Sequence, residues 1–254
     1  MFYLKQAKRF ASVILNYRTA ALAYCLTIIG KIPGFNYTYS KYSEPDYESM
    51  QGYAHGIRLL ELWLFNWKII SLLLRDKEEV SAFHFFLHRS VRDFFRLVKT
   101  IEESLGTSLP VDTNQKVFEP GCGAGRYLGA YLDLYGGKGI GVDGYSAAIK
   151  VANTSNTMNN MAFYEKDLAE PATLDLILSE GVDISFTSSF LVHLTENRVR
   201  LIEQLKKYSK IVFGVEKLNA QLKIELLDSG FTVNEYDDIM VFFWVSKNQN
   251  LINV

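Results

Sequence analysis

The chain has 254 residues, of which 48% are hydrophobic and 22% are charged, and its net charge at neutral pH is −1. This composition is typical of a folded globular protein and excludes a disordered one. A charge so close to zero provides no field to attract a polyanion, so a dedicated nucleic-acid binder is disfavoured. The two cysteines and four histidines show no zinc-ligand spacing, so no metal site is predicted.

The first 31 residues combine apolar and basic side chains. Arg18 interrupts the apolar run 10–30 and leaves it short of the roughly 20 residues that span a bilayer. No acidic residue precedes Glu44. One interpretation is a basic amphipathic helix on an anionic membrane surface. The interpretation we favour is an ordinary helix that packs on the rest of the protein.

The segment up to residue 109 is predicted to be a helical extension. Residues 57–75 and 81–106 have apolar side chains at three- and four-residue spacing, which indicates helices. The stretch 37–53 between them and the N-terminus is rich in tyrosine and turn-forming residues. Its tyrosines suit either a lid over a binding site or anchors between helices. The role of the extension as lid, membrane contact or partner interface stays open.

After residue 110, short apolar runs alternate with helical patterns. Strands are expected over 116–119, 139–143, 161–167, 183–188 and 210–216, and two more within 231–247. Helices are expected from about Arg126, from about Ser146, and over 196–209 and 218–230. This alternation predicts an α/β domain over 110–254, with a mostly parallel sheet and helices on both faces. No helix separates the last two strands, so the final strand should run antiparallel.

A glycine-rich loop follows the first predicted strand. Glycines at 121, 123 and 125 let the backbone turn sharply and let a ligand approach closely. In such a sheet, ligands bind beyond the carboxyl ends of the strands, and Asp143, at the end of the second strand, can accept hydrogen bonds from a ribose diol. The spacing is G-x-G-x-G rather than the dinucleotide pattern. Glu119 would repel a pyrophosphate but suits an amine, and ribose with an amine-bearing tail describes S-adenosylmethionine.

Residues 116–143 resemble motifs I and II of the class I S-adenosylmethionine-dependent methyltransferases, a Rossmann-like family. The segments "YEKDLAE" and "DISFTSSFLVHL" are similar to the family's adenine-side segment and motif IV, and the last strands are also similar. At the position of Gly144 the family often has an apolar side chain that packs on the adenine ring of the cofactor. In this chain the resemblance implies that Tyr145 makes this contact instead. The resemblance implies a cofactor site formed by Glu119, Gly121, Cys122, Gly123, Gly125, Asp143, Gly144, Tyr145, Asp167, Leu168 and Ser188.

His193 follows the strand "ISFTSS" by a few residues and lies near the expected acceptor side. Histidine has an ordinary pKa of about 6.5, which suits a general base for an alcohol acceptor. The alternative is a histidine that only orients its loop. No Asn/Asp-Pro-Pro-aromatic motif follows the fourth strand, since "SSFL" stands there. This difference favours an oxygen acceptor, and O-methylation of a small molecule or a glycan or cell-surface precursor is predicted.

Two other functions stay open at this point. One is an aminopropyl transferase on the same fold, although the acidic pair expected after the fourth strand is missing. The other is a non-catalytic cofactor-binding or scaffold subunit that works with a partner. Cys122 lies inside the glycine loop, which argues against a disulfide and favours a reducing, cytoplasmic compartment, with membrane association through residues 1–31 left open. The sequence does not predict an oligomeric state.

Overall fold

A computed structural model describes most of the chain. The described residues are 2–29, 76–87, 98–103, 105–106, 108–109, 111–155, 160–194, 196–236 and 239–246. The tyrosine-rich stretch 37–53 and the helix predicted over 57–75 lie outside these residues. The structure therefore does not test those two predictions.

The described strands form one sheet with the order β3-β2-β1-β4-β5-β7-β6. Neighbouring pairs from β3 to β5 are parallel, whereas β7 is antiparallel to both β5 and β6. The predicted fold class, a mostly parallel sheet with an antiparallel last strand, is confirmed. The strands are β1 (Lys116–Pro120), β2 (Lys138–Asp143), β3 (Met161–Glu165), β4 (Val182–Ser188), β5 (Ser209–Lys217), β6 (Thr232–Tyr236) and β7 (Ile239–Val245).

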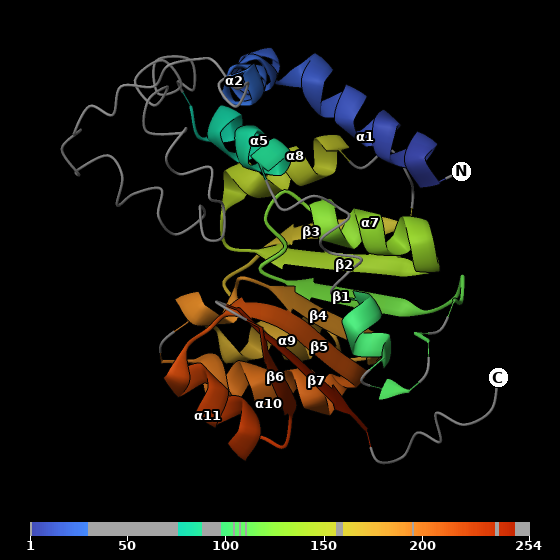
Figure 1. Cartoon of the computed structure of the whole chain (residues 1–254), viewed down its shortest axis with the longest axis vertical. Coiled ribbons are helices and arrows are strands. Elements are labelled where there is room, and N and C mark those ends of the chain that lie inside the picture. The colour runs from blue at the N-terminus through green and yellow to red at the C-terminus, as the bar shows by residue number, and fades with distance from the viewer. Residues whose placement is uncertain are drawn as a thin grey trace.

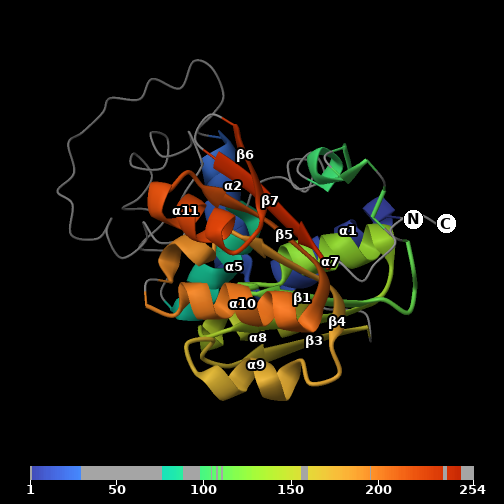
Figure 2. The same ribbon diagram turned by 90° about the horizontal axis from the view of Figure 1, so that it is seen from below.

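Helices cover both faces of the sheet. Val117 and Phe118 are neighbours on β1, yet their side chains enter separate apolar clusters, as the alternation of a strand requires. Figure 2 shows α10 and α11 on one side of β5 and β7, with α7 on the other. The helices beside the first cluster are α7 (Arg126–Tyr135) and α8 (Ser146–Ser155), and those beside the second are α9 (Pro171–Ile177), α10 (Arg198–Tyr208) and α11 (Ala220–Asp228).

The helix starts agree with the sequence patterns. Both α7 and α8 begin at the predicted residues, Arg126 and Ser146. The sequence analysis did not predict α9, whose seven residues are too few to show a clear helical period. Pro171 at its first position was the available signal, because proline is common at the start of helices.

The N-terminal helices α1 (Phe2–Asn16), α2 (Arg18–Ile29) and α5 (Lys77–Leu87) lie outside α7 and α8 (Figure 1). The guanidinium of Arg9 on α1 is buried and pairs with Asp133 on α7, with Nε–Oδ2 and Nη2–Oδ1 distances of 3.1 and 3.0 Å. Glu78 on α5 pairs with Lys150 on α8 at 2.6 Å. The inner face of the extension therefore packs on α7, which follows the glycine loop, and on α8, which follows β2.

The apolar run 10–30 is not one helix. It is divided at Tyr17, where α1 ends and α2 begins. Among the described helices, none combines the length and the apolar character needed to cross a bilayer.

Candidate functional site

The glycine loop connects β1 to α7 at the carboxyl edge of the sheet. The backbone N–H groups of Gly121 and Cys122 both donate to the Val142 carbonyl of β2, at 2.7 and 3.1 Å. Gly121, Gly123 and Gly125 have φ values of +67°, +51° and +73°. Residues that carry a Cβ are strained in this left-handed region, so the loop needs its three glycines.

The three glycines have different surroundings. A Cβ at Gly121 would lie 2.1 Å from the Phe190 ring, and one at Gly125 would lie 2.6 Å from the Phe163 ring. These two positions allow aromatic rings to pack against the loop. A Cβ at Gly123 would meet no atom within 4 Å. Gly123 is therefore the loop position at which a ligand can approach the backbone.

Asp143 holds the loop from the neighbouring strand. Its Oδ2 accepts a hydrogen bond from the Gly123 N–H at 2.9 Å, and its Oδ1 accepts one from the Tyr145 N–H at 2.8 Å. Burial raises the pKa of this carboxyl above its ordinary value, and the two backbone bonds oppose that rise. Each oxygen keeps a further lone pair, so Asp143 can still accept bonds from ligand hydroxyls.

Glu119 lies beneath the loop and is buried. Its Oε2 accepts a hydrogen bond at 3.1 Å from the Leu128 N–H in the first turn of α7. Burial raises the pKa of Glu119 well above its ordinary value, and nearby Asp143 adds to the rise. Cys122 is also buried, and burial together with these two carboxylates raises the pKa of its thiol. The site therefore contains the buried carboxyl of Glu119 and the half-buried carboxyl of Asp143 beside open space at Gly123.

The residues that follow β2 and β3 have separate environments. Gly144 is exposed, and the Tyr145 hydroxyl hydrogen bonds with Ser81 of α5. Asp167 is exposed and accepts a bond from the Ala169 N–H at 2.8 Å, which forms an ordinary polar turn. The Leu168 side chain belongs to the apolar cluster under α9. The structure thus brings Glu119, the glycines and Asp143 together, and gives Asp167 and Leu168 local contacts.

The loop after β4 reaches the glycine loop. Ser188 ends β4 beside Val215 of β5, and Ser189 has a φ of +53°, unusual for a residue other than glycine. Phe190 then places its ring against Gly121. His193 ends the short 3-10 helix η1 (Leu191–His193), has an exposed side chain and donates its backbone N–H to the Phe190 carbonyl at 3.0 Å.

Glu216 is a site residue that the sequence analysis missed. It is 1% exposed, near the end of β5, and its Oε1 accepts bonds from Thr187 Oγ1 and from the N–H groups of Phe190 and Leu191, at 3.2, 3.0 and 2.9 Å. Its Oε2 accepts a longer bond from the Val192 N–H at 3.4 Å. Burial raises the pKa of Glu216 to about 7, although these bonds lower it. The only sequence signal was an acidic residue close to the end of a buried strand.

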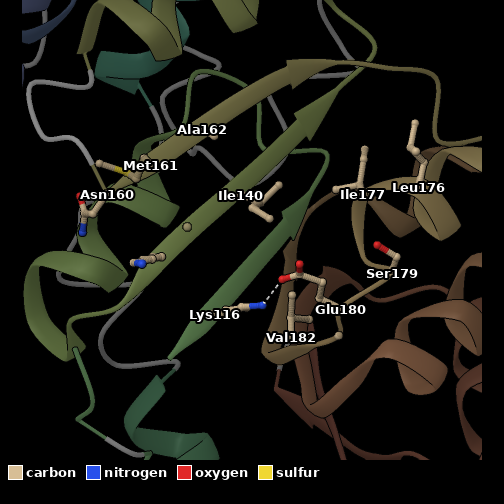
Figure 3. Close-up of a pocket in the computed structure, with 13 residues that line it drawn as sticks. Lys116, Ile140, Asn160, Met161, Ala162, Leu176, Ile177, Ser179, Glu180 and Val182 are labelled. Atoms are coloured by element: carbon tan, nitrogen blue, oxygen red, sulfur yellow. Dashed lines mark hydrogen bonds and ion pairs between the residues drawn. The ribbon is translucent and has the colours of Figure 1, made fainter. Parts of the chain in front are cut away.

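A pocket of about 480 Å³ lies at the opposite, amino-terminal edge of the sheet. Figure 3 shows Ile140, Met161 and Ile177 in its lining, with the ion pair between Lys116 and Glu180 beside it. None of the predicted site residues lines this pocket. Within the described residues, no group of three or more histidine, cysteine or acidic side chains could hold a metal ion.

No family model matches the chain, and no curated protein matches its sequence. Among solved structures, it is similar to a SAM-dependent methyltransferase from Aquifex aeolicus, with 15% identity over 61% of this chain and 97% of the other, at a TM-score of 0.44. It is also similar to magnesium protoporphyrin IX methyltransferase from Synechocystis PCC 6803, solved with bound SAH, with 16% identity over 62% and 83% of the chains and a TM-score of 0.45.

A third similar structure is a fibrillarin/Nop5p complex, with 13% identity over 58% of this chain and 79% of the other, at a TM-score of 0.45. The first two structures are methyltransferases, the family whose motifs the sequence resembles.

Proposed function

We propose that the protein is an S-adenosylmethionine-dependent methyltransferase. The observation that carries this proposal is the arrangement at the carboxyl edge of the sheet. There, Gly123 opens to free space and its N–H is bound by Asp143 from the next strand. The site lies where the strand order reverses between β1 and β4, the usual position for ligands in sheets of this kind.

The chain's own residues fit this cofactor. Open space at Gly123 leaves room for a ligand against the backbone, and the free lone pairs of Asp143 suit the two ribose hydroxyls. An ammonium group near Glu119 would lower the raised pKa of this carboxyl and favour its charged form, whereas a pyrophosphate there would raise that pKa further. These features favour S-adenosylmethionine over a dinucleotide, and we assign the other predicted cofactor residues to the same site.

When bound, S-adenosylmethionine supplies a methyl group on a sulfonium, which is a good leaving group. The protein's task is then to hold an acceptor in line with that methyl at near-attack distance. We propose that His193 removes the acceptor's proton, because it lies at the exposed end of the loop that follows β4. An exposed base allows an acceptor to arrive from solvent.

We propose an oxygen acceptor on a small molecule or a glycan precursor. The support is "SSFL" after β4, which carries hydroxyl and apolar side chains rather than the amides and prolines of nitrogen-methylating sites. The test is a labelled-methyl screen of glycan, lipid and small-molecule pools with the purified full chain. Transfer by the parent that is reduced in Gly123→Ala at low cofactor concentration supports the proposal. Transfer of an aminopropyl group instead would identify the aminopropyl transferase alternative.

The outer face of the N-terminal helices supports a peripheral membrane contact. Leu4, Leu15 and Leu22 are 63%, 67% and 50% exposed, and Lys8 and Arg18 are exposed with them. Exposed apolar side chains among basic ones suit an anionic membrane, and this contact would place the enzyme at a membrane from the cytoplasm. Binding to anionic vesicles should fall with added salt and in Leu15→Ser. Binding of this face to a protein, with no transfer by the chain alone, would favour the scaffold alternative.

A further inference from the structure

Two loops meet at the proposed cofactor site, and they are fixed by different means. The glycine loop has three glycines with positive φ, a composition that leaves the backbone free to adopt many conformations. The loop after β4 has no glycine over 189–192, yet Ser189 has a left-handed φ there. Such a conformation is strained for a residue with a Cβ and persists only where the surroundings impose it.

Glu216 supplies those surroundings. Three consecutive backbone N–H groups, at positions 190, 191 and 192, point at one buried carboxyl. Thr187 Oγ1 donates to the same Oε1, and the Ser189 N–H donates to the Val215 carbonyl at 2.9 Å. Every backbone donor of the segment 189–192 is therefore bound by β5 or by its carboxyl. Without Glu216, the three N–H groups of residues 190–192 would lose their acceptor.

Phe190 connects the loop 189–192 to the glycine loop. Its ring occupies the space where a side chain at position 121 would stand, so it packs directly on the Gly121 backbone. We propose that Glu216 is a positioning residue that fixes the loop 189–192, so that Phe190 holds the glycine loop in its ligand-binding conformation. This inference rests on the proposed function, because it assigns the pre-organisation of that same cofactor site.

The test compares four variants of the full chain by calorimetry with S-adenosylhomocysteine. Glu216→Leu removes all acceptors, and Phe190→Ala removes the ring alone, and each should weaken binding by about tenfold or more. Glu216→Gln keeps an acceptor in place of Oε1 and should bind within about threefold of the parent. The matched control is Glu102→Leu, because Glu102 also binds a backbone N–H, that of Leu109 at 2.8 Å, away from the site. It should leave the affinity unchanged.

A double-mutant cycle sharpens the test. If Glu216 acts through Phe190, adding Phe190→Ala to Glu216→Leu should weaken binding little further, because both changes remove one contact. Unchanged affinity in Phe190→Ala overturns the proposal, and so do additive losses. Loss in Glu216→Gln equal to that in Glu216→Leu also overturns it, because the negative charge would then act directly. Should Glu216→Leu fail to fold, Phe190→Ala still decides.

Hydrogen exchange of the ligand-free protein separates this inference from the proposed function. Amides 121–125 should exchange faster in Phe190→Ala, and amides 190–192 faster in Glu216→Leu, while amides of β1 keep the parent's rates. If the parent does not bind S-adenosylhomocysteine, the cofactor assignment fails. The hydrogen-exchange rates then still test whether Phe190 couples the loop 189–192 to the glycine loop. Unchanged exchange of amides 121–125 in Phe190→Ala would contradict this coupling.

Discussion

The proposed cofactor side and the proposed acceptor side of the site reach their conformations by different means. On the cofactor side, glycines accept positive φ values and Asp143 binds the loop from β2. On the acceptor side, Ser189 adopts a similar φ without being glycine, and a buried carboxyl from β5 binds the segment that follows. The glycines of the first loop allow its backbone conformation. In the second loop, Glu216, which is distant in the sequence but in direct contact, imposes the conformation.

The largest expected effect is on turnover, and it should come from a substitution on the proposed acceptor side that leaves cofactor affinity unchanged. If His193 is the general base, His193→Ala should lower turnover by roughly 10²–10⁴-fold, while the affinity for S-adenosylhomocysteine stays unchanged. If His193 takes the acceptor's proton, the rate of the parent should rise with pH, and the variant should lose that rise. The measurement uses the acceptor found by the labelled-methyl screen.

His193→Asn distinguishes a base from a residue that orients the loop. An amide can hydrogen bond but cannot take a proton at neutral pH. Near-parental turnover in His193→Asn would remove His193 from the proposed chemistry and leave it a structural role.

The second prediction concerns the pH dependence of stability. Burial raises the pKa of Glu216 from 4.5 to about 7. Between these values the folded protein keeps a proton that the unfolded chain has released, so stability falls as pH rises. Relative to Glu216→Gln, the parent should lose roughly 3 kcal/mol of unfolding free energy from about pH 4.5 to about pH 8.

Urea unfolding of the parent and Glu216→Gln across this pH range makes the measurement. Glu119 and Asp143 also have raised pKa values, so both proteins should share part of the slope. The difference between the two curves isolates Glu216. Parallel curves would show that the buried carboxyl titrates as an ordinary one.

Asp143→Ala should act on the cofactor side alone. The variant loses the acceptor for two backbone N–H groups and for the proposed ribose, and we expect a loss of about 1.5–3 kcal/mol in S-adenosylhomocysteine binding. The matched control is Asp112→Ala, because Asp112 accepts a bond from the Asn114 N–H in a turn before β1. Equal affinities of the two variants would place the ligand elsewhere.

The smallest expected effect comes from a single methyl group. Gly123 and Gly230 both have positive φ, +51° and +80°, and a Cβ at either would meet nothing within 4 Å. Gly123→Ala and Gly230→Ala should therefore lower stability by a similar amount, about 1 kcal/mol. Only Gly123→Ala should also weaken S-adenosylhomocysteine binding, by about tenfold, because its methyl group lies where the ligand approaches. Similar affinities in both variants would show that the open space at Gly123 is not used.

The sequence predicted the contiguous parts of the site and missed the contacts made by tertiary packing. Gly121, Gly123, Gly125 and Asp143 lie in one strand-loop-helix-strand unit, so local patterns reveal them. Glu216 lies 24 to 29 residues from the donors it binds, and no local pattern connects them. The packing of Phe190 and Phe163 on Gly121 and Gly125 likewise depends on the fold, and so does the pairing of Arg9 with Asp133, 124 residues apart.

Calorimetry of the full chain with S-adenosylhomocysteine and, separately, with NAD decides which ligand the glycine loop binds. We expect one site for S-adenosylhomocysteine, weakened in Asp143→Ala, and no comparable affinity for NAD. Equal affinity for both ligands, or binding of NAD alone, would contradict this expectation and restore a dinucleotide as the ligand of the glycine loop.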